Sequence, residues 1–234
     1  MNSMKRAGII GGMSWLSTIE YYRLMNEAVS RRLGGLHSAE IIMSSYDFQR
    51  IADLQHTDNW TELAEVLCET ARELQGAGAD FLLIATNTMH KVVPQIEAAT
   101  SLPILHIVDA TAAAVKARGL DRVALLGTKF TMEDGFYVDR LTRIHGLEVV
   151  LPDATEREII HEVLYRELGR GVISPHSREK YLGILERLAG EGAQGVILGC
   201  TEIPLLIKQE HVVMPVFDTT LIHAEAAVDY AIRT

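Results

Sequence analysis

Short apolar runs alternate with longer amphipathic stretches along the whole chain. Such alternation is typical of βαβα folds whose parallel strands are buried on both faces. The pattern therefore predicts an α/β protein with parallel sheets flanked by helices. Eight runs are predicted to be strands: Ala7–Ile10, Glu40–Ser44, Phe81–Ala85, Ile104–Val108, Val123–Gly127, Glu148–Leu151, Gly195–Leu198 and Val213–Phe217.

The stretches between these runs have the periodicity of helices. In residues 61–74, and again in residues 176–188, apolar side chains recur at the i, i+3, i+4 spacing of an amphipathic helix. Gly76 and Gly190 follow these two stretches and suit the position just beyond a helix end.

An internal repeat organises the chain. The segment that begins at Leu74 is similar to the one that begins at Leu188, so that Thr86 corresponds to Cys200. Matches before and after these segments keep a nearly constant spacing, and no long linker separates the two halves. We expect two pseudo-symmetric lobes, with a ligand cleft between the carboxyl ends of their strands.

Composition excludes several classes of protein. The chain has 31 acidic and 22 basic residues, a net charge of −9, and no basic stripe that would bind nucleic acid. No apolar run approaches the roughly 18 residues of a membrane span. The first residues lack the apolar core and cleavage site of a secretory signal. We therefore expect a cytoplasmic protein that binds neither nucleic acid nor membranes.

The cysteines and histidines argue against a metal site. Only two cysteines occur, Cys68 and Cys200, and they lie far apart without the spacing of a zinc site or a disulfide framework. Residues 161–165 depart from the zinc motif H-E-x-x-H at the fifth position, which is Tyr165. We expect no metal, and we expect Cys68 to pack in the core.

Cys200 follows a predicted strand and precedes a predicted helix. Gly199 permits a tight turn before it, and Pro204 suits the first turn of the helix after it. A thiol at a helix N-terminus is expected to have a lowered pKa. The alternative is a buried cysteine with a structural role.

Polar side chains follow the corresponding strands elsewhere. Thr86, Asn87 and Thr88 could form a cradle for a carboxylate, or simply cap the next helix. The glycine-rich turn that contains Met13 and Ser14 lacks the spacing of a dinucleotide or NTP loop. Its counterpart in the second half carries Thr128 and Lys129, and we expect both turns to line one site.

Four segments together resemble the aspartate/glutamate racemase family: Ile10–Trp15, Ala85–Lys91, Leu125–Thr128 and Gly199–Ile203. The resemblance extends from about residue 7 to the C-terminus and looks closest to the broad-specificity amino-acid racemases. It implies a homodimeric isomerase that needs no pyridoxal phosphate or other cofactor. It also implies that residues 1–101 and 212–234 form one lobe and residues 102–211 the other.

The resemblance also assigns catalytic roles. Family members place two cysteines on opposite faces of the substrate α-carbon, and Cys200 matches the second of them. Thr86 stands where the first would be. Because a hydroxyl is much less acidic than a thiol, we expect Cys200 to be the main acid and base. Thr86 is expected to support proton transfer at the opposite face slowly or through water.

Further site residues are implied by the same resemblance. The substrate is expected to be aspartate or glutamate, and one cation should bind its distal carboxylate. Glu202 could position Cys200 or bind the substrate ammonium. The expected substrate-binding residues are Met13, Ser14, Gln55, Asn87, Thr88, Thr128, Thr201 and Glu202, with Arg50, Lys129 and Arg170 as alternatives for the distal carboxylate.

Two other functions remain open from the sequence. Relatives similar to arylmalonate decarboxylase keep a single cysteine that matches Cys200, so a lyase or another isomerase of the same fold is possible. The absence of a second cysteine at position 86 also fits a non-catalytic protein that binds amino acids or dicarboxylates.

Overall fold

The computed structural model describes residues 4–233 and divides into two compact units. Unit 1 comprises the residues up to His106 together with those from His223 onward, and unit 2 comprises Ile107–Ile222. Each unit has its own parallel sheet and its own helices, as the α/β pattern predicts. No helix within residues 4–233 combines the length and the apolar character that a membrane span requires.

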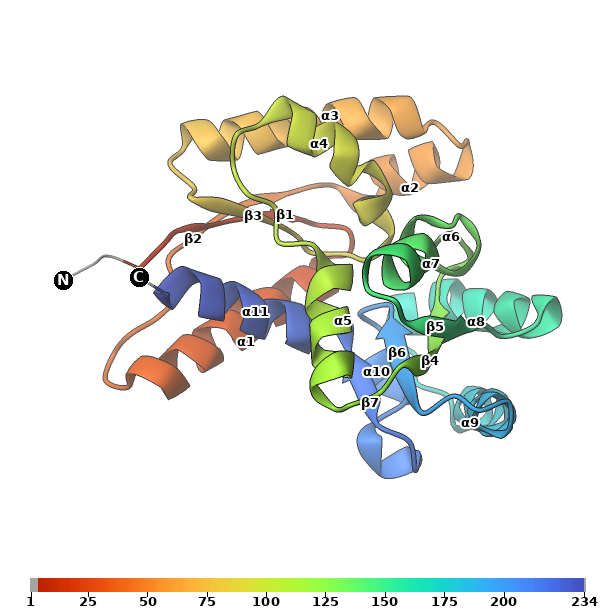
Figure 1. The fold of residues 1–234 in the computed structure, drawn as a ribbon. Coiled ribbons are helices and arrows are strands. Elements are labelled where there is room, and N and C mark those ends of the chain that lie inside the picture. The colour runs from red at the N-terminus through yellow and green to blue at the C-terminus, as the bar shows by residue number, and fades with distance from the viewer. Residues whose placement is uncertain (1–3, 234) are drawn as a thin grey trace. The chain divides into compact units, whose positions relative to one another are not determined.

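Unit 1 contains a three-stranded parallel sheet in the order β2-β1-β3 (Figure 1). Ala7 pairs with Ile41 on one side and with Phe81 on the other. The strands are β1 (Ala7–Gly11), β2 (Ile41–Ser45) and β3 (Phe81–Ile84), and the helices are α1 (Trp15–Leu33), α2 (Phe48–His56), α3 (Trp60–Gly76), η1 (Thr88–Val92) and α4 (Val93–Ala99). Most of α11 (Thr219–Ile232) also belongs to unit 1, but its first residues lie in unit 2.

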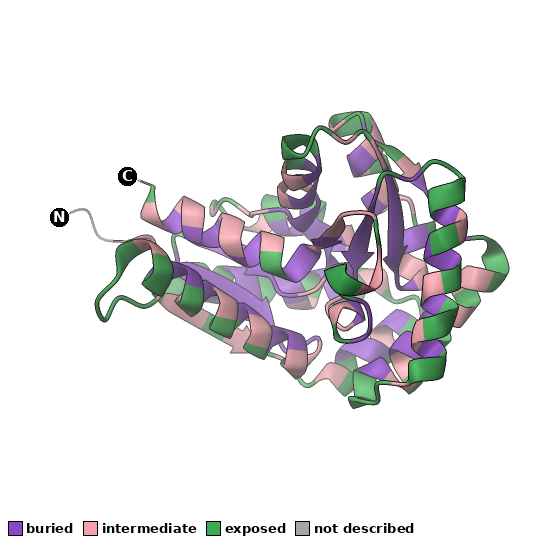
Figure 2. Cartoon of the chain, turned by 90° about the horizontal axis from the view of Figure 1, so that it is seen from below, coloured by how far each residue is buried: buried purple, intermediate pink, exposed green. Residues whose placement is uncertain are grey.

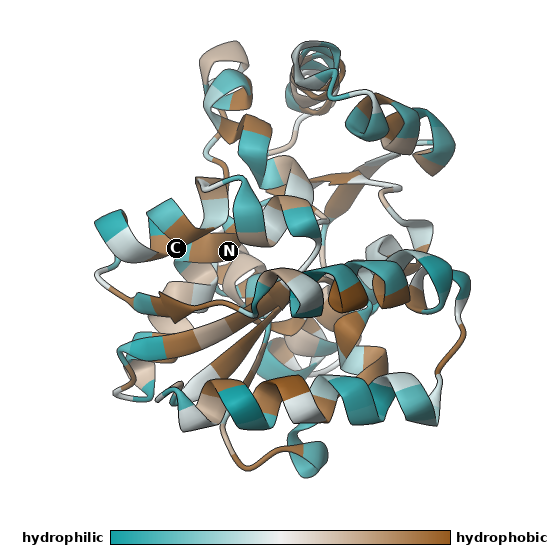
Figure 3. Ribbon diagram, turned by 90° about the vertical axis from the view of Figure 1, so that its right-hand side faces the viewer, coloured by the Kyte–Doolittle hydropathy of each residue, from teal (hydrophilic) through white to brown (hydrophobic). Residues whose placement is uncertain are grey.

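Alternating side chains of this sheet bury both of its faces. Ala7 and Ile9 of β1 pack with α1 and α11, whereas Ile10 packs with α2, α3 and α4. Figure 1 shows α1 and α11 on one side of the sheet and α3 and α4 on the other. In unit 1, β1 and β3 are buried along their whole length, whereas β2 is only partly buried. The helices alternate between buried and exposed residues (Figure 2) and between hydrophobic and hydrophilic ones (Figure 3).

Unit 2 contains a four-stranded parallel sheet in the order β5-β4-β6-β7. Its strands are β4 (Arg122–Gly127), β5 (Glu148–Val150), β6 (Gly195–Gly199) and β7 (Val216–Asp218). Its helices are α5 (Ile107–Ala117), α6 (Lys129–Glu133), α7 (Phe136–Asp139), the π-helical turn η2 (Arg140–Ile144), α8 (Ala154–Arg166), η3 (Leu168–Arg170), α9 (Pro175–Gly190), α10 (Ile203–Leu206) and η4 (Gln209–His211).

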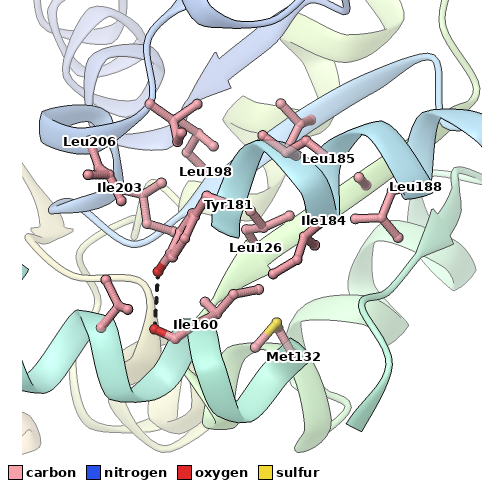
Figure 4. Packing of buried hydrophobic residues seen from close by; sticks show 14 of the residues in the cluster. Leu126, Met132, Ile160, Tyr181, Ile184, Leu185, Leu188, Leu198, Ile203 and Leu206 are labelled. Atoms are coloured by element: carbon pink, nitrogen blue, oxygen red, sulfur yellow. Dashed lines mark hydrogen bonds between the residues drawn. The ribbon is translucent and has the colours of Figure 1, made fainter. Parts of the chain in front are cut away.

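The larger core of unit 2 surrounds Tyr181 of α9 (Figure 4). Leu126 of β4 and Leu198 of β6 point into this core, which α8, α9 and α10 cover. The Tyr181 hydroxyl donates a hydrogen bond to the Ile160 carbonyl of α8 at 3.1 Å. Leu125 points to the opposite face of the sheet, where α5 packs.

The predicted strand Ile104–Val108 is wrong. Only Ile104 forms a bridge, with Leu82, and α5 begins at Ile107. The buried residues Ile107, Val108, Thr111, Ala112 and Val115 recur with the period of a helix, and this longer pattern outweighs the short apolar run.

The boundaries between the two units also differ from the predicted lobe boundaries. Residues 102–106 lie with unit 1, because Leu82 donates to the Pro103 carbonyl and Leu105 donates to the Leu82 carbonyl. Residues 212–222 lie with unit 2, because β7 pairs with β6. The return of the chain to unit 1 therefore occurs at His223 rather than at residue 212.

Gly12 provides a test of how tightly the β1–α1 turn packs. Gly12 and Gly34 both have positive φ, 82° and 70°, so alanine is strained at either position. A Cβ at Gly12 would also lie 2.2 Å from the Tyr46 nitrogen, whereas nothing lies within 4 Å at Gly34. We expect Gly12→Ala to lower the free energy of unfolding by about 2 kcal/mol more than Gly34→Ala. Urea unfolding measures the difference, and equal losses would contradict this packing.

Candidate active site

In unit 1, polar residues gather at the carboxyl ends of β1 and β3. Thr86 and Asn87 follow β3, and η1 begins at Thr88. Asn87 and Thr88 are buried, while Thr86 is half-buried. The prediction that Thr86 lies between a strand and a helix is therefore confirmed.

The turn after β1 is held by hydroxyl groups of α1. Ser14 caps α1 by accepting a hydrogen bond from the Ser17 nitrogen at 3.5 Å. Thr18 Oγ1 accepts from the Gly12 nitrogen at 2.8 Å and donates to the Ser14 carbonyl at 2.9 Å. Met13 is buried in the core beneath α2 and α3. Ser14 is thus the accessible polar side chain of this turn, while Met13 contributes packing.

The two α2 residues of the predicted site have different surroundings. Gln55 is buried, and its Nε2 donates to the Met89 sulfur of η1 at 3.2 Å. It therefore lies beside the turn that carries Thr88. Arg50 is exposed and lines a groove between α2 and α3 together with Glu62 and Glu65. Glu62 and Glu65 carry negative charge in the same groove, so a substrate carboxylate there would compete with them for the guanidinium.

In unit 2, Cys200 and its neighbours follow β6. Cys200 Sγ donates a hydrogen bond to Glu202 Oε2 at 2.9 Å, and Thr201 Oγ1 donates to the same oxygen at 2.8 Å. All three side chains are half-buried. The carboxylate of Glu202 therefore orients both the thiol and the hydroxyl.

The expected lowering of the Cys200 pKa is wrong. Burial and the negative charge of Glu202 raise the pKa of the thiol well above its ordinary value, although backbone N–H groups of Thr201 and Glu202 act in the opposite direction. Helix α10 has only four residues, so its N-terminus offers little compensation. Burial, followed by the electrostatic effects of Cys200 and Glu202, raises the pKa of Tyr165 to about 12.

The turn after β4 carries Thr128 and Lys129. Thr128 caps α6 by accepting from the Thr131 nitrogen at 3.2 Å. Lys129 Nζ forms an ion pair with Glu158, and its backbone nitrogen donates to His161 Nδ1 at 3.3 Å. The third expected cation, Arg170, is exposed at the end of η3.

Sequence reasoning did not identify a buried polar cluster in unit 1. Tyr21, His90, His106 and His223 are all buried. The His90 ring centroid lies 4.6 Å from that of His106 and 5.8 Å from that of His223. The signal in the sequence is a histidine within the apolar stretch around residue 223, which forms a buried helix face.

The hydrogen bonds of this cluster define its tautomers. A carbonyl oxygen can only accept, so His223 Nε2 carries the proton that it donates to the Leu105 carbonyl at 2.7 Å. His223 Nδ1 therefore accepts from the Tyr21 hydroxyl at 2.7 Å. Burial lowers the pKa of His223 to about 4. Burial, with the neighbouring His106 and His223, also places the pKa of His90 well below its ordinary value.

Among residues 4–233, no group of three or more histidine, cysteine, aspartate and glutamate side chains is arranged to hold a metal ion.

Comparisons with known proteins identify the family. The Asp/Glu/Hydantoin racemase family model matches residues 10–227. A candidate Asp/Glu racemase from Yersinia pestis is 52% identical, with a TM-score of 0.94, and the match covers 98% of this chain and 100% of that one. An aspartate racemase homologue from Pyrococcus horikoshii is 35% identical, with a TM-score of 0.86 and the same coverage. The broad-specificity amino-acid racemase of Bacillus subtilis is 23% identical over 170 residues, 71% of each chain.

The chain belongs to the Asp/Glu/Hydantoin racemase family, as the sequence motifs indicate. Its fold of parallel sheets flanked by helices in two lobes is that of the family's solved structures. It is an isomerase of the amino-acid racemase class.

The buried His223 makes stability depend on pH. Its folded pKa of about 4 lies below the ordinary 6.5, so the folded state binds fewer protons than the unfolded state. The stabilisation that comes from keeping His223 neutral is fully present above pH 6.5. It is lost as the pH drops toward 4, by about 3 kcal/mol. We expect His223→Asn to be less stable at neutral pH but to lose less on acidification, as urea unfolding at several pH values measures. The exposed His37→Asn serves as the control, and an unchanged slope in His223→Asn would contradict the assignment.

The contact with Glu202 predicts the reactivity of Cys200. In a Cys68→Ala background Cys200 is the one remaining thiol, and we expect slow alkylation by iodoacetamide at neutral pH because the thiolate is scarce. Glu202→Gln removes the negative charge, so it should lower the pKa of the thiol and speed alkylation. The exposed Glu210→Gln is the control. An alkylation rate that Glu202→Gln leaves unchanged over the whole pH range would show that Glu202 does not set the pKa.

Proposed function

We propose that this racemase acts on aspartate, glutamate or both without a cofactor, with Cys200 as its main acid and base and Thr86 on the opposite face of the α-carbon. The hydrogen bond from Cys200 Sγ to Glu202 Oε2, at 2.9 Å, carries the proposal. Family members named for aspartate and for broad specificity support the substrate class.

The Cys200–Glu202 contact suits proton abstraction. The α-hydrogen of an amino acid is weakly acidic, so the base must be a thiolate in a site that stabilises the developing enediolate. Glu202 can receive the thiol proton along the existing hydrogen bond. A substrate ammonium placed close to Cys200 Sγ would stabilise the thiolate that this transfer leaves. Cys200 then removes the α-hydrogen, and the electron pair passes into the α-carboxyl group.

Thr86 makes the two directions unequal. Its hydroxyl can donate a proton to the opposite face of the enediolate and recover one from water. In the reverse direction, the same hydroxyl would have to act as a base, for which its acidity is poorly matched. One enantiomer should therefore exchange its α-hydrogen faster than the other.

Substrate binding completes the proposal. Asn87, Thr88 and Thr201 would bind the α-carboxylate and the amino group, with Ser14 and Thr128 from the paired turns. For the distal carboxylate, Arg170 is exposed, whereas Lys129 would first have to leave Glu158. A homodimer in the cytoplasm remains part of the proposal.

The α-hydrogen exchange of each enantiomer in deuterated water tests the proposal. We expect exchange with both aspartate and glutamate or with one of them, faster for one enantiomer. Cys200→Ala should abolish it, and Thr86→Cys should speed inversion and reduce the asymmetry because a thiol is the stronger acid. Mass spectrometry measures deuterium, and chiral chromatography measures inversion.

Four outcomes would overturn parts of this assignment. Exchange that survives in Cys200→Ala would exclude Cys200 as the base, and equal exchange of both enantiomers would exclude the asymmetry. Carbon dioxide release from a disubstituted malonate, without amino-acid exchange, would identify a lyase. Thermal stabilisation by aspartate or glutamate without exchange would identify a binding protein.

A further inference from the structure

The backbone around Thr86 is held by side chains from two other elements. The Ala85 nitrogen continues the pairing with β1 by donating to the Ile10 carbonyl at 2.9 Å. The Ala85 carbonyl accepts from Ser17 Oγ of α1 at 3.2 Å. One residue later, the Thr86 carbonyl accepts from His90 Nδ1 of η1 at 2.8 Å. The peptide groups on both sides of the Thr86 Cα are therefore fixed.

The His90 ring is itself immobilised. Only 2% of His90 is exposed, and its ring packs against His106 and His223. His223 has both ring nitrogens engaged, one with Tyr21 and one with the Leu105 carbonyl. Because each ring is held by the next, His90 cannot turn away from Thr86 without disturbing the buried cluster.

Helix α1 joins both sets of contacts. Ser17, which bonds the Ala85 carbonyl, and Tyr21, which bonds His223, lie one turn apart on its buried face. Burying three imidazoles is unfavourable compared with burying apolar side chains unless their hydrogen bonds are kept. A polar cluster held by such hydrogen bonds selects one arrangement of the turn, which an apolar cluster of similar size would not do.

We propose that His90 is a positioning residue for Thr86: its Nδ1–H, held in place by His106, His223 and Tyr21, fixes the peptide that carries the Thr86 hydroxyl. This inference rests on the proposed role of Thr86 in protonating one face of the substrate. A displaced hydroxyl would slow that step alone and leave abstraction by Cys200 intact.

Substitution of His90 by asparagine or by glutamine distinguishes the roles of its two ring nitrogens. The amide nitrogen of asparagine is as many bonds from Cβ as Nδ1 of histidine and can keep the bond to the Thr86 carbonyl. The amide nitrogen of glutamine corresponds to Nε2 and loses that bond. His37→Asn, at an exposed histidine of the same unit, is the matched control.

Inversion and deuterium incorporation are measured for the enantiomer whose α-hydrogen faces Cys200, which is the one that still exchanges in Thr86→Ala. We expect His90→Gln to slow inversion by roughly ten- to a hundredfold, because small displacements of reacting groups cost about that much. Deuterium incorporation without inversion should stay within about twofold of the wild type. Cys200 still removes the α-hydrogen and, after its thiol exchanges with the solvent, returns a deuteron. His90→Asn should recover most of the inversion rate, and His37→Asn should match the wild type.

Parallel losses of inversion and incorporation in His90→Gln, or equal losses in His90→Asn and His90→Gln, would overturn the positioning role. Nuclear magnetic resonance of the ring nitrogens tests the geometry independently of activity. We expect the Nδ1–H tautomer of His90 and a Thr86 amide signal that shifts in His90→Gln more than in His90→Asn. The Nε2–H tautomer would overturn the inference even in an active enzyme. Wild-type protein that shows the expected tautomer but exchanges no amino acid would instead contradict the proposed function.

Discussion

Backbone pairing between parallel strands is the constraint that brings the candidate residues of each unit together. In unit 1, β1 and β3 pair in register as far as Ile10 and Ile84, and in unit 2, β4 and β6 pair as far as Gly127 and Gly199. Strands that run in the same direction and end together bring their following turns side by side. The turn that contains Ser14 therefore lies beside that of Thr86, and Thr128 lies beside Cys200.

Each unit then places one polar arrangement against an apolar core. In unit 2, Glu202 accepts hydrogen bonds from Cys200 and Thr201 and keeps the thiol protonated in the absence of substrate. In unit 1, His90 and His223 are kept neutral by burial. In the proposed mechanism, the first arrangement sets the charge state of Cys200 and the second sets the position of Thr86. Both depend on low local polarity, which strengthens hydrogen bonds and disfavours isolated charges.

Much of this organisation could be predicted from local patterns. The strands around Ile10, Leu83, Leu126 and Ile197 are continuous apolar runs, because a sheet covered on both faces needs apolar side chains at every position. Thr86 and Cys200 were placed correctly between strand and helix by the internal repeat. The helix that begins at Ile107 was not predicted, because a short apolar run fits a strand and a buried helix equally well.

The amino-acid sequence by itself determined the α/β class, the family and which side chains follow the strands, since these depend on periodicity and on neighbouring residues. Only the tertiary structure decided the raised pKa of Cys200, the pairing of Lys129 with Glu158 and the cluster around His90. Burial of a side chain, and an ion pair such as that of Lys129, depend on residues distant in sequence, as the contact between Tyr21 and His223 shows. The periodicity of the sequence does not predict contacts between residues that are distant along the chain.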